Sequence, residues 1–406
     1  MADRPLSILM MIHRLMDNSP YCFYVHEQAK ALASQGHDVR VISCLGAPPP
    51  GVRLPGERAD IIKGTPRQAV IDGIPVAYPR YLTLGNAGER LLGGQLMARA
   101  ALPAARRFHA ERPFDIVHAH MIAADGHAGL LVARALGVPC ALTVHGTDVL
   151  RYFVPGEKPL PRLRRVADGV DALMAVSSLL MARVAPYRSR EKLTRVVPNG
   201  VDLSLVPETT QGTPRAVISV GTLKARKCMD RTLEAFARLA GEYPDATLTI
   251  VGQGEMEAQL RERIAALGLQ ERVTLTGGLA HEEVLRRMAG SDLFVLPSWG
   301  EGYGIVYIEA MAAGCIAIGA KNEGIEDTIT DGVNGLLVPA GDVDEIERAM
   351  RAVFERPQDF EALRRRGQQD ARELTWARNA RTVQGVYREA IARYGRDQGR
   401  NGHAKG

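Results

Sequence analysis

Residues 296–311 of this 406-residue chain read LPSWGEGYGIVYIEAM. The pattern predicts a buried strand that ends at Leu296, a loop with three glycines, and a helix that begins near Gly304. Glycines let the backbone approach a ligand closely, and the first turn of a helix presents unpaired N–H groups to an anion. The stretch therefore predicts a strand–loop–helix unit of an α/β fold that is suited to binding a diphosphate.

The same alternation of strand and helix runs through almost the whole chain. In the N-terminal half, strands are expected at residues 8–12, 39–43, 116–118, 141–144, 172–176 and 194–197, and helices at 25–35, 87–111 and 128–136. A linker rich in Pro, Thr and Gly occupies residues 203–214. Beyond it, strands are expected at 217–220, 248–251, 273–276, 293–296 and 316–318, with helices between them. This rhythm is typical of parallel, doubly wound sheets.

Two Rossmann-like domains follow from this pattern, at residues 1–203 and 214–375. We expect them to face each other across a central cleft, where ligands bind outside the carboxyl ends of the strands. The last helix, at 376–394, is expected to pack back on the N-terminal domain, and the polar residues 395–406 to form a frayed tail.

The composition, with 46% hydrophobic and 24% charged residues, is that of an ordinary globular protein, and no apolar run approaches the roughly 20 residues of a membrane span. The five cysteines form no CxxC pair, which argues against a disulfide framework or a zinc site and suits the cytoplasm. Only 5% of residues are aromatic, and none interleave with the basic stretches, so nucleic acid is not an expected partner.

Charge is unevenly distributed along the chain. Residues 1–205 contain 25 Lys and Arg against 17 Asp and Glu, whereas the remainder contains 26 against 29. The positive half predicts a peripheral contact with an anionic membrane at its inner face, and the alternative is a solvated surface. Four arginines that carry the hypothesis lie in one helical stretch: Arg99, Arg106, Arg107 and Arg112.

Four titratable side chains are candidates for chemistry. Glu301 and Glu309 lie eight positions apart, so both carboxylates could face one pocket and accept sugar hydroxyls; the alternative is one residue beside a helix N-terminus and one on the surface. Lys227 comes between a strand and a helix, and His145 follows the strand at 141–144. For these two, the alternatives are a solvated loop charge and a structural histidine. The sequence has neither a complete nicotinamide fingerprint nor a cluster with metal-ligand spacing.

The chain resembles the retaining glycosyltransferase family 4, which has the GT-B fold. The resemblance covers nearly the whole chain through landmarks in the family's order: HEQAKALASQGHDVRVI at 26–42, FDIVHAH at 114–120, TVHGTDV at 143–149, VPNGVD at 197–202, VGTLKARKCMDRTLEAFARL at 220–239, EAMAAGCIAIGA at 309–320 and NGLLVPAGD at 334–342. The stretch at 296–311 resembles the family's Glu-x7-Glu motif. Within the family, the chain is similar to enzymes that build bacterial surface polysaccharides, including the teichuronic-acid type.

The resemblance implies a role for each candidate. Glu309 would hold the ribose hydroxyls of the donor, Glu301 would face the transferred sugar, and Lys227 would bind the phosphates in place of a metal. His145 would lie near the reacting anomeric centre. The loop that contains Leu279 would border the nucleotide base. Backbone N–H groups would meet the sugar and diphosphate at Tyr303, Gly304 and Ile305.

Three departures from the family pattern bear on these roles. The family often has an arginine where this chain has Thr222, so a phosphate contact is missing or comes from Lys224 or Arg226. The usual glycine-rich loop after the first strand is replaced by residues 18–23, which bears on acceptor binding. Residues 322–326 read NEGIE where many members have Gly-Gly-x-x-Glu.

The resulting hypothesis is a retaining glycosyltransferase of polysaccharide biosynthesis. It would move a hexose from a nucleotide sugar to a glycan or lipid-linked acceptor, without a cofactor or a metal. The alternatives are a GT-B nucleotide-sugar epimerase or sugar phosphorylase and, from another class, a nucleotide-sugar-binding protein without catalysis. The donor base, the sugar and the acceptor stay open.

Overall fold

The computed structural model describes residues 4–13, 23–49, 51–52, 57–83, 85–208 and 215–403. Residues 18–22 of the predicted acceptor-side loop and 209–214 of the linker lie outside this part of the chain. The chain divides into two compact units. The first unit comprises Met1–Pro198 and Trp376–Gly406, and the second unit is Asn199–Thr375.

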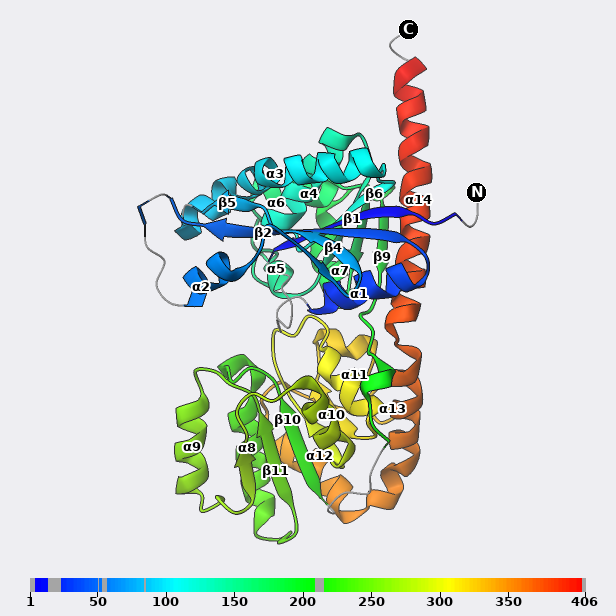
Figure 1. The fold of residues 1–406 in the computed structure, drawn as a ribbon. Helices are drawn as coiled ribbons and strands as arrows, with labels where there is room; N and C mark the ends of the chain where they lie inside the picture. The colour runs from blue at the N-terminus through cyan, green and yellow to red at the C-terminus, as the bar shows by residue number, and fades with distance from the viewer. Residues whose placement is uncertain are drawn as a thin grey trace. The chain divides into compact units, whose positions relative to one another are not determined.

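The first unit is built on a mostly parallel sheet with the order β3-β4-β2-β1-β6-β7-β8-β9, and β5 also pairs with β2. Only β3 and β4 pair in the antiparallel direction among the described strands. The central strand β1 reads SILMMIH and is almost entirely buried because helices cover both faces of the sheet (Figure 1). The strands are β1 (Ser7–His13), β2 (Asp38–Ala47), β3 (Gln68–Ile71), β4 (Ile74–Ala77), β5 (Arg80–Leu82), β6 (Ile116–His120), β7 (Cys140–Val144), β8 (Ala172–Ala175) and β9 (Leu193–Val196).

Helices α3 and α4 lie on one face of this sheet and α1 lies on the other (Figure 1). Helix α4 ends where Gly137 adopts a left-handed conformation and its N–H caps the carbonyls of Ala133 and Arg134. The helices of the unit are α1 (Phe23–Ser34), α2 (Glu57–Gly64), α3 (Gly85–Glu111), α4 (Ala124–Leu136), α5 (Thr147–Leu150), α6 (Pro161–Gly169), α7 (Ser178–Val184) and α14 (Trp376–His403).

Helix α14 follows the second unit in sequence but contacts α1, β7 and β8 of the first unit. Asn379 fixes it in two directions: its Oδ1 accepts from Gln28 at 2.8 Å, and its Nδ2 donates to the carbonyl of Pro198 at 2.6 Å. The prediction of a frayed tail after residue 394 was wrong, because the helix continues through Gly395 to His403. This last stretch contains Gly395, Gly399 and Gly402 between residues such as Arg and Gln that favour a helix.

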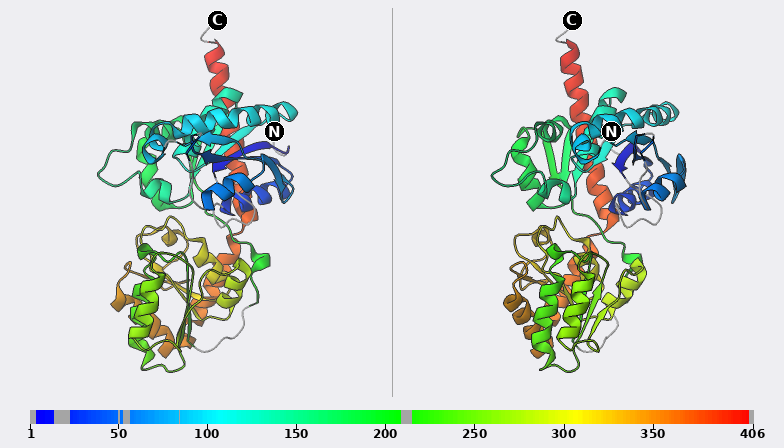
Figure 2. Two further views of the ribbon diagram at one scale, coloured as in Figure 1. Left: turned by 60° about the vertical axis from the view of Figure 1, so that its left-hand side comes forward. Right: turned by 90° about the vertical axis from the view of Figure 1, so that its left-hand side faces the viewer.

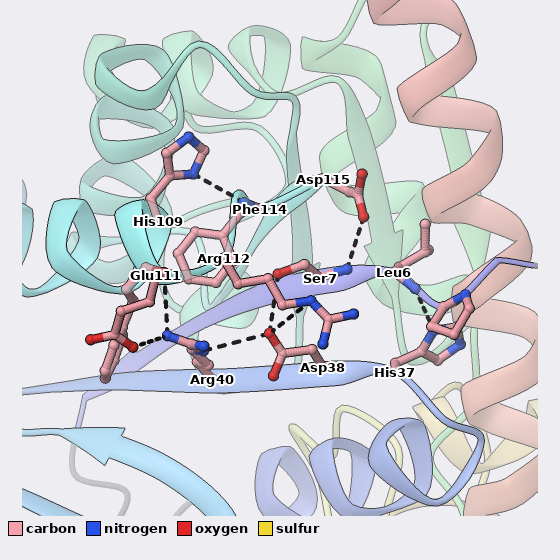
Figure 3. A network of polar contacts seen from close by, with 12 residues as sticks. Leu6, Ser7, His37, Asp38, Arg40, His109, Glu111, Arg112, Phe114 and Asp115 are labelled. Carbon is pink, nitrogen blue, oxygen red and sulfur yellow. Dashed lines mark hydrogen bonds and ion pairs between the residues drawn. The ribbon is translucent and has the colours of Figure 1, made fainter.

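The C-terminal end of α3 is joined to β2 by ion pairs, which Figure 3 shows. Arg40 on β2 lies 2.5 Å from Glu111, and Arg112 lies 3.6 Å from Asp38. A carboxylate of Asp115 accepts the N–H of Ser7 at 2.8 Å at the start of β1. These contacts fix the connection between α3 and β6. One of the arginines predicted for membrane contact, Arg112, takes part in them.

The second unit has a fully parallel sheet with the order β12-β11-β10-β13-β14-β15 among the described strands. Helices cover both faces, as the views of Figure 2 show. Its strands are β10 (Ala216–Val220), β11 (Thr247–Val251), β12 (Val273–Leu275), β13 (Leu293–Val295), β14 (Ile316–Ala320) and β15 (Leu336–Val338). Its helices are α8 (Met229–Ala240), α9 (Glu257–Ala266), α10 (His281–Ala289), α11 (Ile305–Ala312), α12 (Val343–Glu355) and α13 (Glu361–Glu373).

The prediction of two Rossmann-like α/β units with parallel sheets is confirmed. None of the described helices combines the length and the apolar composition that crossing a membrane would require. The described cysteines are buried free thiols: Cys44, Cys140, Cys228 and Cys315.

Candidate active site

The strand order of the second unit places two loops side by side. β10 and β13 are hydrogen-bonded neighbours, but the chain continues from β10 to β11 on one side and from β13 to β14 on the other. A crevice opens at such a switch point, outside the carboxyl ends of the strands. The loop after β10 contains Lys227, and the loop after β13 contains Glu301. Most of the predicted donor-site residues therefore converge at this point.

The loop that connects β13 to α11 is held by buried side chains. Tyr307 on α11 donates its hydroxyl proton to the carbonyl of Leu296, and its oxygen lies 3.2 Å from the hydroxyl of Ser298. Gly304 precedes the helix with φ of 84°, and a Cβ at this position would lie 2.6 Å from the ring of Tyr307. Only glycine fits a left-handed conformation against that ring.

The carboxylate of Glu323, after β14, forms a backbone clamp on the same loop: it accepts two N–H groups of the loop. Its Oε1 accepts the N–H of Gly300 at 2.9 Å, and its Oε2 accepts the N–H of Glu301 at 2.7 Å. The N–H of Gly324 in turn donates to the carbonyl of Glu301 at 3.0 Å. The segment that departs from the family pattern therefore fixes the backbone of Glu301, a role that the sequence did not predict.

Lys227 and Glu301 form a close ion pair. The Lys227 Nζ lies 2.5 Å from the Glu301 Oε2, and their side chains are only 10% and 14% exposed. Arg226 approaches the same carboxylate oxygen at 3.7 Å through Nη1, and its own carbonyl accepts the N–H of Trp299 at 2.9 Å. A single carboxylate thus lies beside two cations, and the loops after β10 and β13 are joined by both side-chain and backbone contacts.

Glu309 lies on α11 and is 8% exposed, so it is not the surface residue of the alternative hypothesis. Its Oε1 lies 2.8 Å from the Nε2 of His281, the first residue of α10. Leu279 is half-buried two residues earlier, in the loop after β12. The predicted ribose residue is thus bonded to His281, which follows the predicted base residue in the chain and was not predicted from the sequence.

Three further predicted residues meet at the start of α11. The side chain of Tyr303 is 2% exposed and donates to the carbonyl of Asn199 at 3.3 Å, so only its backbone is free to contact a ligand. Burial raises the pKa of its phenol, which keeps it protonated. Within the described part of the chain, the N–H groups of Tyr303, Gly304 and Ile305 have no intramolecular acceptor. Unpaired N–H groups at the start of a helix are suited to binding an anion.

His145 belongs to the first unit, directly after β7. Its Nε2 lies 3.0 Å from the Nδ1 of His120 at the end of β6, and the ring of Tyr24 lies tilted against its own ring with centroids 4.3 Å apart. Burial lowers the pKa of His145 to about 3, so the imidazole is neutral at physiological pH. The contact with His120 was not predicted from the sequence.

The second unit thus brings Glu301 into contact with Lys227. Glu309 instead pairs with His281, so the two carboxylates have separate partners. Among the residues that the structure describes, no three His, Cys, Asp or Glu side chains are grouped so that they could hold a metal ion. The positive charge of the candidate site comes from Lys227 and Arg226.

Comparisons with known proteins identify the family of the chain. Residues 23–205 match the family described as Glycosyltransferase Family 4, and residues 205–373 match the family described as Glycosyl transferases group 1. The chain is 28% identical over 396 residues to D-inositol 3-phosphate glycosyltransferase 1 of Catenulispora acidiphila, and this similarity covers 91% of this chain and 90% of the relative. It is 27% identical over 355 residues to the glycogen synthase of Mycobacterium tuberculosis, with 82% of each chain covered.

A solved structure of HepE from Anabaena in complex with UDP-glucose has a TM-score of 0.71 at 19% identity, over 95% of this chain and 100% of that one. The two Rossmann-like units with parallel sheets define a GT-B fold. The chain belongs to the glycosyltransferases that combine these two family domains, and it is an enzyme that transfers sugar from a nucleotide-sugar donor.

Proposed function

We propose that the enzyme transfers a hexose, with retention of the anomeric configuration, from a nucleotide sugar bound to the second unit to a glycan or lipid-linked acceptor in polysaccharide biosynthesis. The observation that carries the proposal is the cluster of Lys227, Glu301 and the unpaired N–H groups at the start of α11, at the switch point of the sheet. This arrangement has the charge and the donors that a diphosphate requires.

The diphosphate is assigned to two sets of donors. Lys227 supplies an ammonium with three N–H donors, of which Glu301 uses one. The N–H groups of Tyr303, Gly304 and Ile305 supply the helix start. Arg226, rather than the exposed Lys224, is the side chain that approaches this cluster, so it is the candidate to replace the arginine that the family often has at Thr222.

The two carboxylates are assigned to the two ends of the donor. Glu309 would accept the ribose hydroxyls, with its carboxylate oriented by His281, and Leu279 would border the base. Glu301 would face the transferred sugar, because its carboxylate lies beside the proposed phosphate-binding lysine. His145 of the first unit would act near the anomeric centre.

Two features of the chemistry are inferred from this assignment. Lys227, Arg226 and the helix start would stabilise the leaving diphosphate, which is the work that a divalent metal performs elsewhere, so we propose that no metal is required. Membership of glycosyltransferase family 4 supports retention, with the acceptor hydroxyl attacking from the face that the diphosphate leaves.

A donor panel tests the proposal. The full chain is incubated with UDP-, GDP- and ADP-hexoses, with and without an acceptor set of D-inositol 3-phosphate, glycogen and a lipid-linked oligosaccharide. We expect release of one nucleoside diphosphate that is accelerated by one acceptor, and NMR of the product should show the anomeric configuration of the donor. An isomerised donor without an acceptor would indicate an epimerase, dependence on inorganic phosphate a phosphorylase, and binding without turnover a non-catalytic protein.

We also propose a peripheral contact with an anionic membrane through α3. Two of the four predicted arginines have acidic partners. Arg107 lies 3.9 Å from Glu111, and Arg112 lies 3.6 Å from Asp38. Arg99 and Arg106 are exposed and have no acidic partner in the described part of the chain. Flotation with anionic vesicles should be reduced by their joint substitution with glutamine, and equal recovery with neutral vesicles would contradict the proposal.

A further inference from the structure

Three histidines meet at the carboxyl ends of two neighbouring strands in the first unit. His118 and His120 point to the same face of β6, and His145 follows β7. The ring centroids of His118 and His120 lie 4.1 Å apart, and those of His120 and His145 lie 5.3 Å apart with the rings nearly parallel. The cluster therefore connects the interior of the sheet to the residue that is assigned to the reacting sugar.

The hydrogen bonds in this cluster divide it into two parts. Both nitrogens of His118 are engaged, with the hydroxyl of Tyr387 at 2.6 Å and with the hydroxyl of Thr143 at 2.8 Å. His120 and His145 share one hydrogen bond, between Nδ1 of His120 and Nε2 of His145, at 3.0 Å. The other nitrogens of this pair, Nε2 of His120 and Nδ1 of His145, are buried without a partner among the described residues.

Each ring of the pair carries a single proton. Burial lowers the pKa of His145 to about 3, and burial together with the neighbouring histidines lowers that of His120 well below its usual value. One N–H is used in the shared bond, so the other must be located on one of the two unpartnered nitrogens. If His145 donated, the unpaired N–H would belong to His120; if His120 donates, it belongs to His145.

The two arrangements differ in cost. His120 is 0% exposed, so an N–H on its Nε2 would stay unpaired in the interior permanently. Orphaned buried N–H groups are rarer in proteins than under-used acceptors, because a lost donor costs the full desolvation penalty. His145 is only half-buried, and the ring of Tyr24 lies tilted against it with the centroids 4.3 Å apart, so an N–H on this ring lies nearer to the surface of the unit than one on His120.

We propose that His120 is a positioning residue: it donates its Nδ1–H to the Nε2 of His145 and so fixes His145 as the Nδ1–H tautomer, a hydrogen-bond donor to a hydroxyl oxygen of the transferred sugar. The inference rests on the proposed function, in which His145 acts at the sugar. It assigns His145 an electrophilic role and excludes it as a general base, because its only free position carries a proton.

Nitrogen NMR of the full chain tests the tautomer directly. With histidine-specific 15N labelling, the signals of His145 are assigned by their loss in His145→Gln. We expect a protonated Nδ1 and an unprotonated Nε2 in the wild type. His120→Leu removes the donor and should shift His145 toward the Nε2–H form, which is favoured in free histidine. Tyr387→Phe, the control, removes a hydrogen bond from the same cluster and should leave the His145 tautomer unchanged.

Kinetics of the same variants test the consequence. His120→Leu should lower kcat by roughly 10- to 100-fold, because most of His145 no longer presents a donor in the transition state, and should leave nucleoside diphosphate affinity unchanged. His120→Asn has an amide N–H that can replace Nδ1–H, so it should restore both the tautomer and most of kcat.

An Nε2–H tautomer in the wild type, or an unchanged kcat in a folded His120→Leu, would overturn the proposal. A wild type that turns over no nucleotide sugar would contradict the proposed function instead, and the NMR result would still decide the tautomer.

Discussion

Glu301→Gln is expected to tighten nucleoside diphosphate binding while it lowers both stability and kcat. The Glu301 carboxylate lies 2.5 Å from Lys227 and 3.7 Å from Arg226, so it neutralises the cations that are assigned to the diphosphate. Glutamine keeps the size of the side chain and its backbone clamp to Glu323 but removes the charge. The phosphates then no longer compete with a carboxylate for Lys227.

The magnitude follows from the burial of the pair. A hydrogen bond to a charged group contributes about 1.5–3 kcal/mol net, and Lys227 is only 8% exposed, so unfolding should become easier by about that amount. Lys227 has three donors and can keep some contacts, so we expect about half of this energy, roughly 0.7–1.5 kcal/mol, to return as affinity, which is roughly a 3- to 12-fold lower Kd. The loss of charge at the sugar should lower kcat by roughly 100-fold.

Calorimetry with UDP, ADP and GDP measures the affinity, and urea unfolding with and without the bound diphosphate measures the stability. Glu326→Gln, which removes an exposed carboxylate close to the same clamp in sequence, is the control and should change neither quantity. Weaker diphosphate binding in Glu301→Gln would refute the reasoning, because the carboxylate would then support the phosphate site rather than compete for it.

Three further outcomes test the assignment of the donor site. Glu309→Gln should weaken nucleoside diphosphate binding by roughly 10- to 150-fold and mainly raise KM, because the ribose is unchanged by the reaction; a loss confined to kcat would contradict this. Arg226→Gln should weaken diphosphate binding by roughly 10-fold, whereas Lys224→Gln, at an exposed position, should not; the reverse order would show that Lys224 replaces the missing arginine. Activity should survive EDTA, and a loss that magnesium or manganese restores would transfer the leaving-group role from Lys227 to a metal.

Local patterns in the sequence were sufficient to predict most strands and helices. The strand–loop–helix stretch at 296–311 combines an apolar run, glycines and a helical period, and the structure has α11 starting at Ile305. The hairpin of β3 and β4 was not predicted, since these strands have only four residues each and β3 is largely exposed. Helix α6 was not predicted, although its apolar residues Leu163 and Val166 are buried.

The contacts inside the candidate site depend on strand order, which local patterns do not contain. Lys227 and Glu301 are 74 residues apart in the chain and meet only because β10 and β13 are neighbours. The bond between His120 and His145 likewise requires that β6 and β7 pair in a register that aligns His120 with Thr143. Glu323 could have been suspected, because it follows β14 at the same edge of the sheet.

Binding of nucleoside diphosphates to Lys227→Met, compared with the wild type, tests the central claim most directly, since methionine replaces the ammonium without leaving a cavity. Lys321→Met, on an exposed lysine after β14, is the matched control. The account predicts that one of UDP, ADP and GDP binds the wild type and the control with equal affinity and binds Lys227→Met at least about 10-fold more weakly. Equal binding to all three proteins, or no binding of any diphosphate to the wild type, would contradict a donor site at the switch point of the second unit.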